Sequence, residues 1–580
     1  MLWTKCNRMA VATGTKKMRP NPGSRLLWDV ARGLMAAAVL GCAGSGAATA
    51  QAVAESTLYD LPNPPEIRSE NGVLRGTLTM APAEITVDGR TVVSNVINGN
   101  YMAPTMRIRR GDTIRVRVVN KIGAAEVAID GPQPTNIHYH GMDVRPKRGD
   151  GDNVYIRINP EKELRYDVFV PDDHPQGLHW YHAHVHTYVD DQIGSGISGM
   201  LIVGGFIFEQ YPELVGHKQR VMVLKDFTFP DFVDGDPRAK SLNGYANPPI
   251  RARPGEWQVW QLGNLGADAF FDMQLDGHQF WLIERDGNLL LRPVKINHLF
   301  LPPGARAVVV VRAGAAGEYA FRHLNVDTGP AGDPNPPEQL GTFIVSGNPV
   351  PPDPTIRKRL VDGPARPARI VPSPATVAKL KPDRTRYVDF SESADGNTFF
   401  INNKEYVESR IDTTTRVGQV EKWIVRNFSQ EFHVFHLHQT EFLIKRFSGD
   451  RNQTLGGGLR DVINIPYAQN GQPGFAEILI PFTNPIIAGE FVYHCHLVQH
   501  EDAGMMANIR VLPQRTAAEM VWDKVTQLAG FDLPPLGATA ASDAPALVAG
   551  QGDICRPDEQ PPVPTASAGP TIPTRMAAGG

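Results

Sequence analysis

The 580-residue chain has little surplus charge, few cysteines and, near its N-terminus, only a short hydrophobic run. Its formal net charge of −3 offers none of the basic excess on which nucleic-acid binding depends, so no nucleic-acid partner is expected. Four cysteines are too few for a disulfide-rich scaffold. The apolar run at residues 33–40 is shorter than the roughly 20 residues of a transmembrane helix, so no membrane span is expected.

Residues 1–50 have the features of an export signal. Seven Lys and Arg residues precede the apolar run, and Ala48-Thr49-Ala50 is a small-residue cleavage pattern. We expect a periplasmic or secreted protein, cleaved after Ala50. Lipid attachment at Cys42 is the alternative, although Leu40 is large at a position where small residues are usual.

Glycine and proline are abundant, with 55 and 49 residues, which favours many turns and therefore β structure over a helical bundle. An internal repeat indicates the same. Residues 111–120, 255–264 and 418–427 each begin with Gly and end with Asn, with apolar and polar residues alternating between them. This pattern predicts a turn that leads into a strand. The repeats are 144 and 163 residues apart, which is the spacing of whole domains.

A second repeat starts at Gly177, Gly317 and Gly489, so the fold class is expected to be all-β, with three tandem β-sandwich domains. The expected domains are residues 58–206, 207–347 and 383–513. A proline-rich linker is expected at 348–382, a helix at 514–535, and a disordered tail rich in Ala, Pro and Gly at 536–580.

Ten of the 17 histidines lie in four short motifs. Residues two apart in a strand point to the same face, so each His-x-His pair presents two imidazoles in one direction. Eight buried imidazoles without a metal would leave many donors and acceptors to satisfy, so a metal cluster is expected. The four pairs are His138 and His140, His182 and His184, His436 and His438, and His494 and His496. The middle repeat has Arg322 and Leu324 instead, so the second domain is expected to carry no ligands.

A second centre is expected on the opposite face of the same strands in the third domain. Alternation turns His433 and Cys495 away from the imidazole pairs, and His500 and Met505 follow at regular spacing. Two His and one Cys with a weak axial Met form the blue-copper arrangement. Imidazoles alone would also suit zinc or iron, but the thiolate and thioether favour copper.

With these motifs, residues 61–513 resemble the three-domain multicopper oxidases, a family that includes laccases, cuprous oxidases and bilirubin oxidases. The resemblance implies cupredoxin-like Greek-key domains and four copper ions. It implies a type 1 copper held by His433, Cys495, His500 and Met505, and a type 2 copper held by His138 and His436. For the binuclear type 3 pair it implies His140, His182, His184, His438, His494 and His496. It also implies that electrons from a reducing substrate pass through Cys495 to His494 and His496, and that O2 is reduced to water.

Reduction of O2 consumes four protons, so carboxylic acids are expected near the cluster. Glu501 stands where related bacterial enzymes carry a proton-relay acid. Asp150 and Asp152 follow the first motif, where the family has a second such acid; Asp152 is slightly preferred and both stay open.

The expected activity is laccase-like oxidation of phenols or aromatic amines, with O2 and a small reducing substrate as partners of a monomer. Glu431 is a candidate contact for that substrate. One alternative is a cuprous oxidase in periplasmic copper tolerance, which the scattered distribution of the 15 methionines disfavours. The other is a copper-free scaffold protein of the cell envelope, which the complete ligand set disfavours.

Overall fold

Each of the three Gly-to-Asn repeats forms the same strand at the same place in its sheet. They are β5 (Thr113–Asn120), β13 (Trp257–Asn264) and β24 (Gln419–Asn427). Each is parallel to one earlier strand and antiparallel to one later strand. The final Asn is fully buried, and its Nδ2 donates to two backbone carbonyls, one in the loop that follows and one 37 or 38 residues further along the chain. The repeated Asn therefore fixes the exit of the strand in all three copies.

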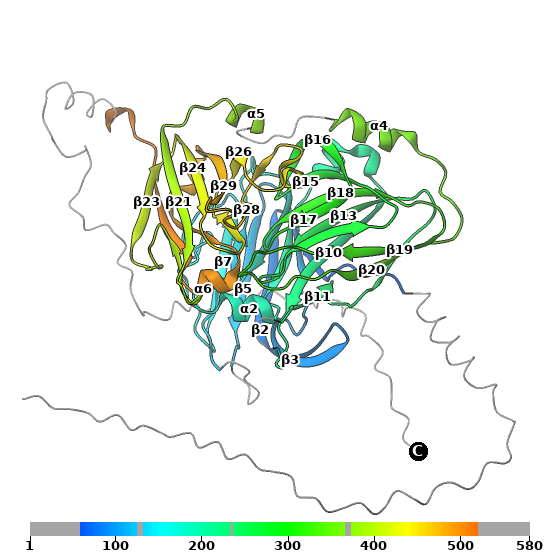
Figure 1. The fold of residues 1–580 in the computed structure, drawn as a ribbon, viewed down its shortest axis with the longest axis horizontal. Helices are drawn as coiled ribbons and strands as arrows, with labels where there is room; N and C mark the ends of the chain where they lie inside the picture. The colour runs from blue at the N-terminus through cyan, green and yellow to red at the C-terminus, as the bar shows by residue number, and fades with distance from the viewer. Residues whose placement is uncertain (1–58, 124–130, 233–235, 366–372, 520–580) are drawn as a thin grey trace, which may run out of the picture. The chain divides into compact units, whose positions relative to one another are not determined.

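The computed structural model describes residues 59–123, 131–232, 236–365 and 373–519 (Figure 1). The expected export signal and the expected tail lie outside these residues. Only residues 514–519 of the expected C-terminal helix are described. Within the described ranges, no helix has both the length and the apolar character needed to cross a membrane.

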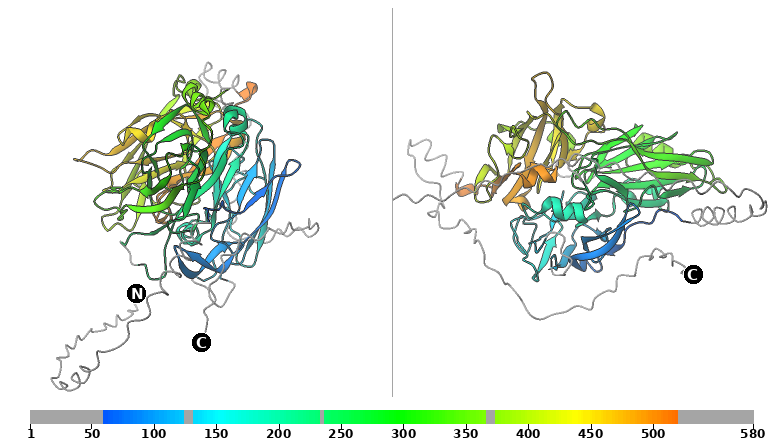
Figure 2. Two further views of the ribbon diagram at one scale, coloured as in Figure 1. Left: turned by 90° about the vertical axis from the view of Figure 1, so that its right-hand side faces the viewer. Right: turned by 60° about the horizontal axis from the view of Figure 1, so that its bottom comes forward.

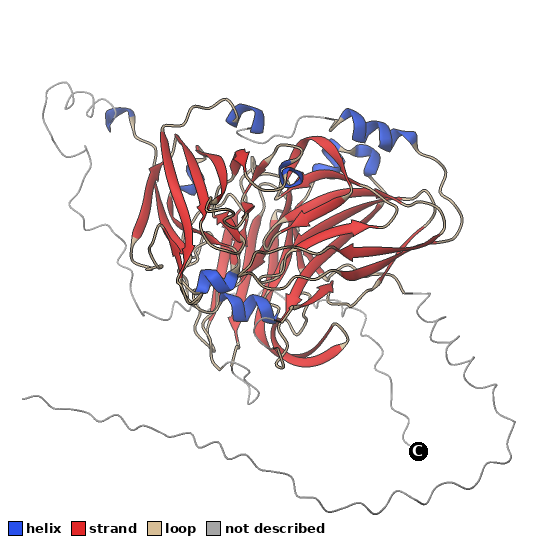
Figure 3. Ribbon diagram, viewed as in Figure 1, coloured by secondary structure: helices blue, strands red, loops and turns tan. Residues whose placement is uncertain are grey.

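The chain folds into three pairs of sheets, and strands dominate throughout (Figure 3). The first pair has the strand orders β3-β2-β5-β7 and β1-β4-β9-β8-β6. Neighbouring strands that are not consecutive in the chain give the crossovers of Greek-key sandwiches. Its other strands are β1 (Glu66–Arg68), β2 (Val73–Val87), β3 (Arg90–Ile97), β4 (Thr105–Ile108), β6 (His138–His140), β7 (Glu163–Phe169), β8 (Gly177–His182) and β9 (Ser198–Val203).

The second pair of sheets has the orders β11-β10-β13-β18-β15-β16 and β12-β20-β19-β14-β17. Its other strands are β10 (Lys218–Phe227), β11 (Ala239–Leu242), β12 (Pro249–Ala252), β14 (Phe271–Leu275), β15 (Phe280–Arg285), β16 (Asn288–Ile296), β17 (His298–Leu301), β18 (Arg306–Arg312), β19 (Gly317–His323) and β20 (Glu338–Val345).

The third pair repeats the second, with the orders β22-β21-β24-β29-β26-β27 and β23-β31-β30-β25-β28. Its other strands are β21 (Arg384–Glu392), β22 (Phe399–Ile401), β23 (Ile411–Arg416), β25 (His433–Leu437), β26 (Phe442–Phe447), β27 (Leu459–Arg460), β28 (Val462–Ile465), β29 (Gly474–Phe482), β30 (Gly489–Cys495) and β31 (Met506–Leu512). The expected all-β class with three tandem sandwiches is confirmed, while the exact domain limits stay predictions.

The helices are short and lie in the connections between strands (Figure 3). They are α2 (Val189–Ser195), α3 (Phe206–Gln210), α4 (Pro354–Asp362), α5 (Pro374–Val377) and α6 (Val498–Asp502), with 3-10 turns at Pro212–Leu214, Arg451–Thr454 and Pro485–Ile487. The stretch interpreted as a linker thus contains α4 and α5. In α4, Asp353 caps the N-terminus by accepting from Thr355, and Ile356 and Leu360 are buried.

Two contacts position the site between the first and third sandwiches. α2 and α6 lie side by side (Figure 1, Figure 2). The carboxylate of Asp502 in α6 accepts from the backbone N–H of Thr187 and of Asp190, at 2.6 and 2.9 Å. One carboxylate of the third sandwich therefore anchors the start of a helix of the first.

Candidate metal centres

The first sandwich contributes four buried histidines from two paired strands. β6 and β8 are antiparallel, with His138 opposite His182. His140 follows on β6, and His184 lies just beyond the end of β8. The ring centroid of His138 lies 5.2 Å from that of His182 and 5.2 Å from that of His184. The imidazoles of β6 and β8 therefore lie on the same side of the sheet.

The third sandwich contributes two different faces of one strand pair. β25 and β30 are antiparallel, with His436 opposite His494 and Phe435 opposite Cys495. Alternation therefore turns His436 and His494 to one side and Cys495 to the other, as the sequence predicts. His433 lies on the Cys495 side.

The imidazoles of the two sandwiches meet in one buried cluster. The ring of His140 stacks on that of His436 at a centroid distance of 3.8 Å, and the ring of His138 stacks on that of His438 at 3.9 Å. Nε2 of His494 lies 3.1 Å from Nε2 of His438. Nitrogens from strands about 300 residues apart in sequence thus converge, for example at 3.3 Å between Nε2 of His184 and Nε2 of His494.

The hydrogen bonds of this cluster fit a metal. In protein metal sites one ring nitrogen of a histidine is held by a carboxylate or carbonyl, while the other binds the metal. Four histidines are held in this way through Nδ1. The partner of His138 is the carboxylate of Asp152. The partners of His182, His436 and His494 are the backbone carbonyls of Ala183, Asp461 and Cys495, respectively. Buried nitrogens without a hydrogen-bond partner belong to His138, His140, His182, His184, His436, His438 and His496.

The cluster also favours neutral rings, which is the form that binds metal. Burial, with repulsion from neighbouring imidazoles, lowers the pKa of His138, His182 and His436 well below the usual value. The pKa of His184 falls to about 4 and that of His496 to about 3, with burial the largest cause. The lone pairs of these nitrogens are therefore available at neutral pH.

The second candidate centre lies on the Cys495 side. Nδ1 of His433 lies 3.0 Å from Nδ1 of His500, and Sγ of Cys495 lies 3.6 and 3.8 Å from these two nitrogens. Burial lowers the pKa of His433 and of His500, and raises that of the Cys495 thiol. A cation between the three side chains would hold the thiol as thiolate, so this donor set also fits a metal.

Met505 is held beside this centre by two backbone hydrogen bonds. Its N–H donates to the carbonyl of His500 at 2.9 Å, and its carbonyl accepts from the N–H of Cys495 at 3.0 Å. Its side chain is fully buried. The loop after α6 therefore brings the thioether residue back to the strand that carries the thiol.

Glu501 lies between histidines of both sandwiches. Its carboxylate oxygens are 3.3 Å from Nδ1 of His184 and 3.0 Å from Nδ1 of His494. Burial alone would raise the pKa of Glu501, but these two imidazoles lower it below its usual range. The carboxylate is thus the acid that bridges the two halves of the cluster.

Asp152 also touches the cluster, whereas Asp150 does not. Oδ2 of Asp152 lies 2.8 Å from Nδ1 of His138, and burial raises the pKa of this carboxyl to about 7. Asp150 instead forms an ion pair with Lys147 at 2.9 Å, and its side chain is 44% exposed.

The second sandwich carries no histidine of the cluster but contacts it at two residues that the sequence motifs miss. Arg306 donates to both carboxylate oxygens of Asp461 at 2.7 Å, and Asp461 lies 3.5 Å from Nε2 of His140. Gly304 has a φ of +81°, and a Cβ there would lie 3.1 Å from atoms of His140 and His496. Only the folding of one sandwich onto the others brings these residues to the cluster, so no spacing in the sequence signals them.

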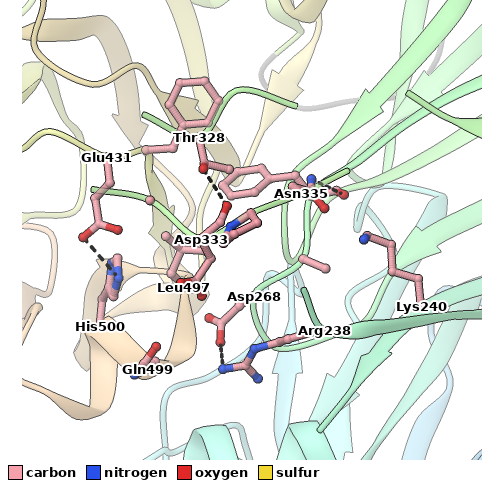
Figure 4. Close-up of a pocket in the computed structure, with 15 residues that line it drawn as sticks. Arg238, Lys240, Asp268, Thr328, Asp333, Asn335, Glu431, Leu497, Gln499 and His500 are labelled. Carbon is pink, nitrogen blue, oxygen red and sulfur yellow. Dashed lines mark hydrogen bonds and ion pairs between the residues drawn. The ribbon is translucent and has the colours of Figure 1, made fainter. Parts of the chain in front are cut away.

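A pocket of about 520 Å³, its mouth included, opens beside His500 (Figure 4). Nε2 of His500 lies 3.4 Å from a carboxylate oxygen of Glu431. The pocket wall carries side chains of both charge signs. Arg238 and Asp268 form an ion pair at 2.5 Å on the side of the pocket opposite Glu431. Phe270 and Phe432 also line it, with ring centroids 5.6 Å apart. His500 of the Cys495 centre therefore forms part of the wall of this pocket.

Comparison with protein families gives three matches to models described as multicopper oxidase. They cover residues 79–205, 178–346 and 377–515, which is well over half of the chain. Each match contains most of the strands of one sandwich.

Individual relatives are distant but span most of the chain. It is 24% identical to the multicopper oxidase mco of Staphylococcus aureus over 71% of this chain and 83% of that protein. It is 23% identical to the cell division protein FtsP of Photorhabdus laumondii, over 78% of this chain and 92% of that protein. Relatives of this kind thus include both an oxidase and a cell division protein.

Solved structures show the same fold. A multicopper oxidase of Campylobacter jejuni described as a metallo-oxidase has a TM-score of 0.64 and 23% identity, over 79% of this chain and 95% of that one. The laccase-like multicopper oxidase CueO of an Ochrobactrum species has a TM-score of 0.61 and 22% identity, over 78% and 100%.

Proposed function

Because the chain belongs to the multicopper oxidase family, we propose that it couples four one-electron oxidations of a small reducing substrate to the reduction of O2 to two waters. The reaction takes four electrons and four protons for each O2. The observation that carries the proposal is the pair of buried donor sets on opposite faces of β25 and β30. We propose phenols or aromatic amines as the substrates.

The proposed cofactor is four copper ions. His433, Cys495 and His500 would hold the type 1 ion, with Met505 as the axial ligand. His138 and His436 would hold the type 2 ion. The type 3 pair would be held by His140, His182, His184, His438, His494 and His496. When bound, copper supplies one-electron redox chemistry at the first centre and reduction of O2 to water at the second.

The residues between the centres support transfer of electrons. Cys495 is bonded through the backbone to His494 on one side and His496 on the other, so a few covalent bonds connect the donor sets. Both histidines and the cysteine are fully buried. Exclusion of water around this segment limits side reactions of partly reduced oxygen.

The proposed proton-relay residues are Glu501 and Asp152. Each holds a carboxylate oxygen within about 3 Å of an Nδ1 of the cluster, Glu501 at His494 and Asp152 at His138. Both are fully buried at the cluster. Asp152, whose pKa is raised, would donate a proton, and the Glu501 carboxylate would accept a proton and pass it on to the cluster.

The pocket beside His500 supports an aromatic donor. Glu431 would accept a hydrogen bond from a phenol O–H or an amine N–H, while Phe270 and Phe432 would contact the ring. Glu431 beside His500 and the similarity to the Campylobacter jejuni metallo-oxidase favour a second candidate, oxidation of a metal cation such as Cu(I). The described lining of the pocket contains no Met or Cys, the soft ligands that Cu(I) prefers.

The proposal also includes an exported monomer. Features of residues 1–50 support export to the periplasm or the medium. A single chain supplies both halves of the histidine cluster from its own first and third sandwiches, so a second copy is not needed to complete it.

The test is O2 uptake by the copper-loaded full chain with 2,6-dimethoxyphenol and, separately, with Cu(I). We expect uptake with the phenol to exceed uptake with Cu(I), and Glu431→Gln to raise the KM for the phenol several-fold. Glu490→Gln, at a part-exposed ion pair with Arg510, is the matched control and should leave the KM unchanged. Uptake with Cu(I) alone would replace the laccase-like proposal with a metal oxidase, and no uptake with either would contradict both.

A further inference from the structure

A second, smaller cavity lies between the second and third sandwiches, away from the pocket beside His500. Arg285 at the end of β15, Arg460 at the end of β27 and Asn464 on β28 line it. Its apolar wall comes from Phe300 and Ile463 among others. The free space has room for about one water-sized sphere. None of the proposed copper ligands lines this cavity.

Both arginines of this cavity are buried with unused hydrogen-bond donors. Each is only 4% exposed. Arg285 donates from Nη1 to the carbonyl of Phe300 at 3.2 Å, but its Nε is buried and has no partner. The side chain of Arg460 has no hydrogen bond or ion pair with any residue in the part of the chain that the structure describes. Buried cations in proteins are normally paired, so this arrangement calls for a ligand.

Asn464 adds a second unsatisfied group to the same cavity. The residue is fully buried, and neither its Nδ2 nor its Oδ1 has a hydrogen-bond partner. An amide N–H beside two guanidinium groups gives the cavity a set of donors from three strands. Convergent donors of this kind suit an anion.

The nearby carboxylates make their contacts with Arg306. Both oxygens of Asp461 accept from Arg306 at 2.7 Å. Asp286 also lines the cavity, and its Oδ1 accepts from the backbone N–H of Arg306 at 2.8 Å. Within the described residues, no carboxylate oxygen lies within 4.0 Å of a guanidinium nitrogen of Arg285 or Arg460. Burial, together with the repulsion from Arg460, lowers the pKa of Arg285 to about 9, which is consistent with the lack of a contact counter-ion.

We propose that this cavity binds one small anion of the size of chloride, held by Arg285, Arg460 and the amide of Asn464. Its size excludes polyatomic anions as large as phosphate. The bound anion would join β15 of the second sandwich to β27 and β28 of the third. Because it needs neither copper nor a reducing substrate, this proposal stands or falls separately from the proposed oxidase activity.

Crystals of the copper-loaded full chain soaked in sodium bromide provide the direct test. Bromide replaces chloride in such sites and is located by its anomalous scattering. We expect a peak within hydrogen-bond distance of Nε of Arg285 and of the Arg460 guanidinium. Bromide at exposed arginines only, with water or nothing in the cavity, would overturn the proposal.

Thermal unfolding gives an independent test in solution. We expect the Tm to be higher in potassium chloride than in potassium gluconate of equal ionic strength by about 2 °C or more. Arg460→Gln should lose this difference. Arg446→Gln on neighbouring β26 is the matched control, because its side chain is 70% exposed, and it should keep the difference.

Asn464→Asp covers the case in which Arg460→Gln fails to fold. The new carboxylate would supply the missing negative charge from within the chain. We expect its Tm in gluconate to reach or exceed that of the wild type, with no further rise in chloride. A chloride-dependent rise equal to that of the wild type in this variant would contradict the proposal.

Discussion

Oδ2 of Asp152 lies 2.8 Å from Nδ1 of His138, and the same oxygen accepts a hydrogen bond from Gln439 of the third sandwich at 2.8 Å. One buried carboxylate thus orients an imidazole of the first sandwich and contacts the third. This relationship connects the assembly of the cluster to the proposed supply of protons.

Asp152→Asn should slow O2 reduction by about 10- to 100-fold, because the amide cannot supply a proton and is a weaker acceptor for His138 than the carboxylate. Reduction of the type 1 centre by the donor should keep its rate, as measured by bleaching of the blue absorption in the absence of O2. Asp150→Asn is the control, since Asp150 is bound to Lys147 at the surface, and it should retain full turnover. Equal losses in the two variants would contradict the role of Asp152.

Gly304→Ala should reduce the copper content of the chain. The added Cβ would lie 3.1 Å from atoms of His140 and His496, so the methyl group displaces rings of the cluster. Gly99→Ala is the matched control: its φ is +73° against +81° at Gly304, and no atom lies within 4 Å of the new Cβ. In both variants the free energy of unfolding should fall by about 1 kcal/mol, because alanine is strained in the left-handed backbone conformation. Only Gly304→Ala should contain less copper by elemental analysis.

Arg306→Gln should lower the free energy of unfolding by about 3–5 kcal/mol, because it leaves Asp461 as an unpaired buried charge. Denaturant unfolding measures this loss. Arg426→Gln removes a part-exposed ion pair with Asp389 and should cost less than about 1 kcal/mol. A loss as small for Arg306→Gln as for the control would show that the buried pair does not hold the sandwiches together.

His323 should make the protein less stable in acid. Burial lowers the pKa of His323 to about 4, and its Nδ1 accepts from the N–H of Asp272 at 3.1 Å. The unfolded chain binds a proton near pH 6.5 and the folded chain only near pH 4, so stability falls as the pH drops through this window. The loss is of the order of 3 kcal/mol, and His323→Gln should remove it in unfolding curves measured at pH 7 and pH 4.5. Equal pH dependence in the variant and the wild type would contradict this.

The two faces of β25 and β30 could be predicted from sequence because strand alternation is local. The spacing of His436 from His433, and the position of Cys495 between two histidines, place the donor sets on opposite sides whatever the rest of the chain does. The fold class could be predicted for a similar reason, because a short local pattern repeats along the chain. The buried Asn that ends each repeat makes the same kind of hydrogen bond in all three sandwiches.

The contacts of the second sandwich could not be predicted. Arg306 and Gly304 reach the cluster only because one sandwich packs on the others, and an interface between domains has no period in the sequence. The choice between Asp150 and Asp152 also needed the path of the loop, which turns one carboxyl inward and leaves the other at the surface.

The most direct test of the account is the ratio of donor oxidised to O2 consumed by the full chain loaded with copper. We predict four one-electron oxidations for each O2, with no hydrogen peroxide released. A ratio of two with accumulating peroxide, or no O2 uptake by protein that holds its full complement of copper, would contradict the coupling of the two centres.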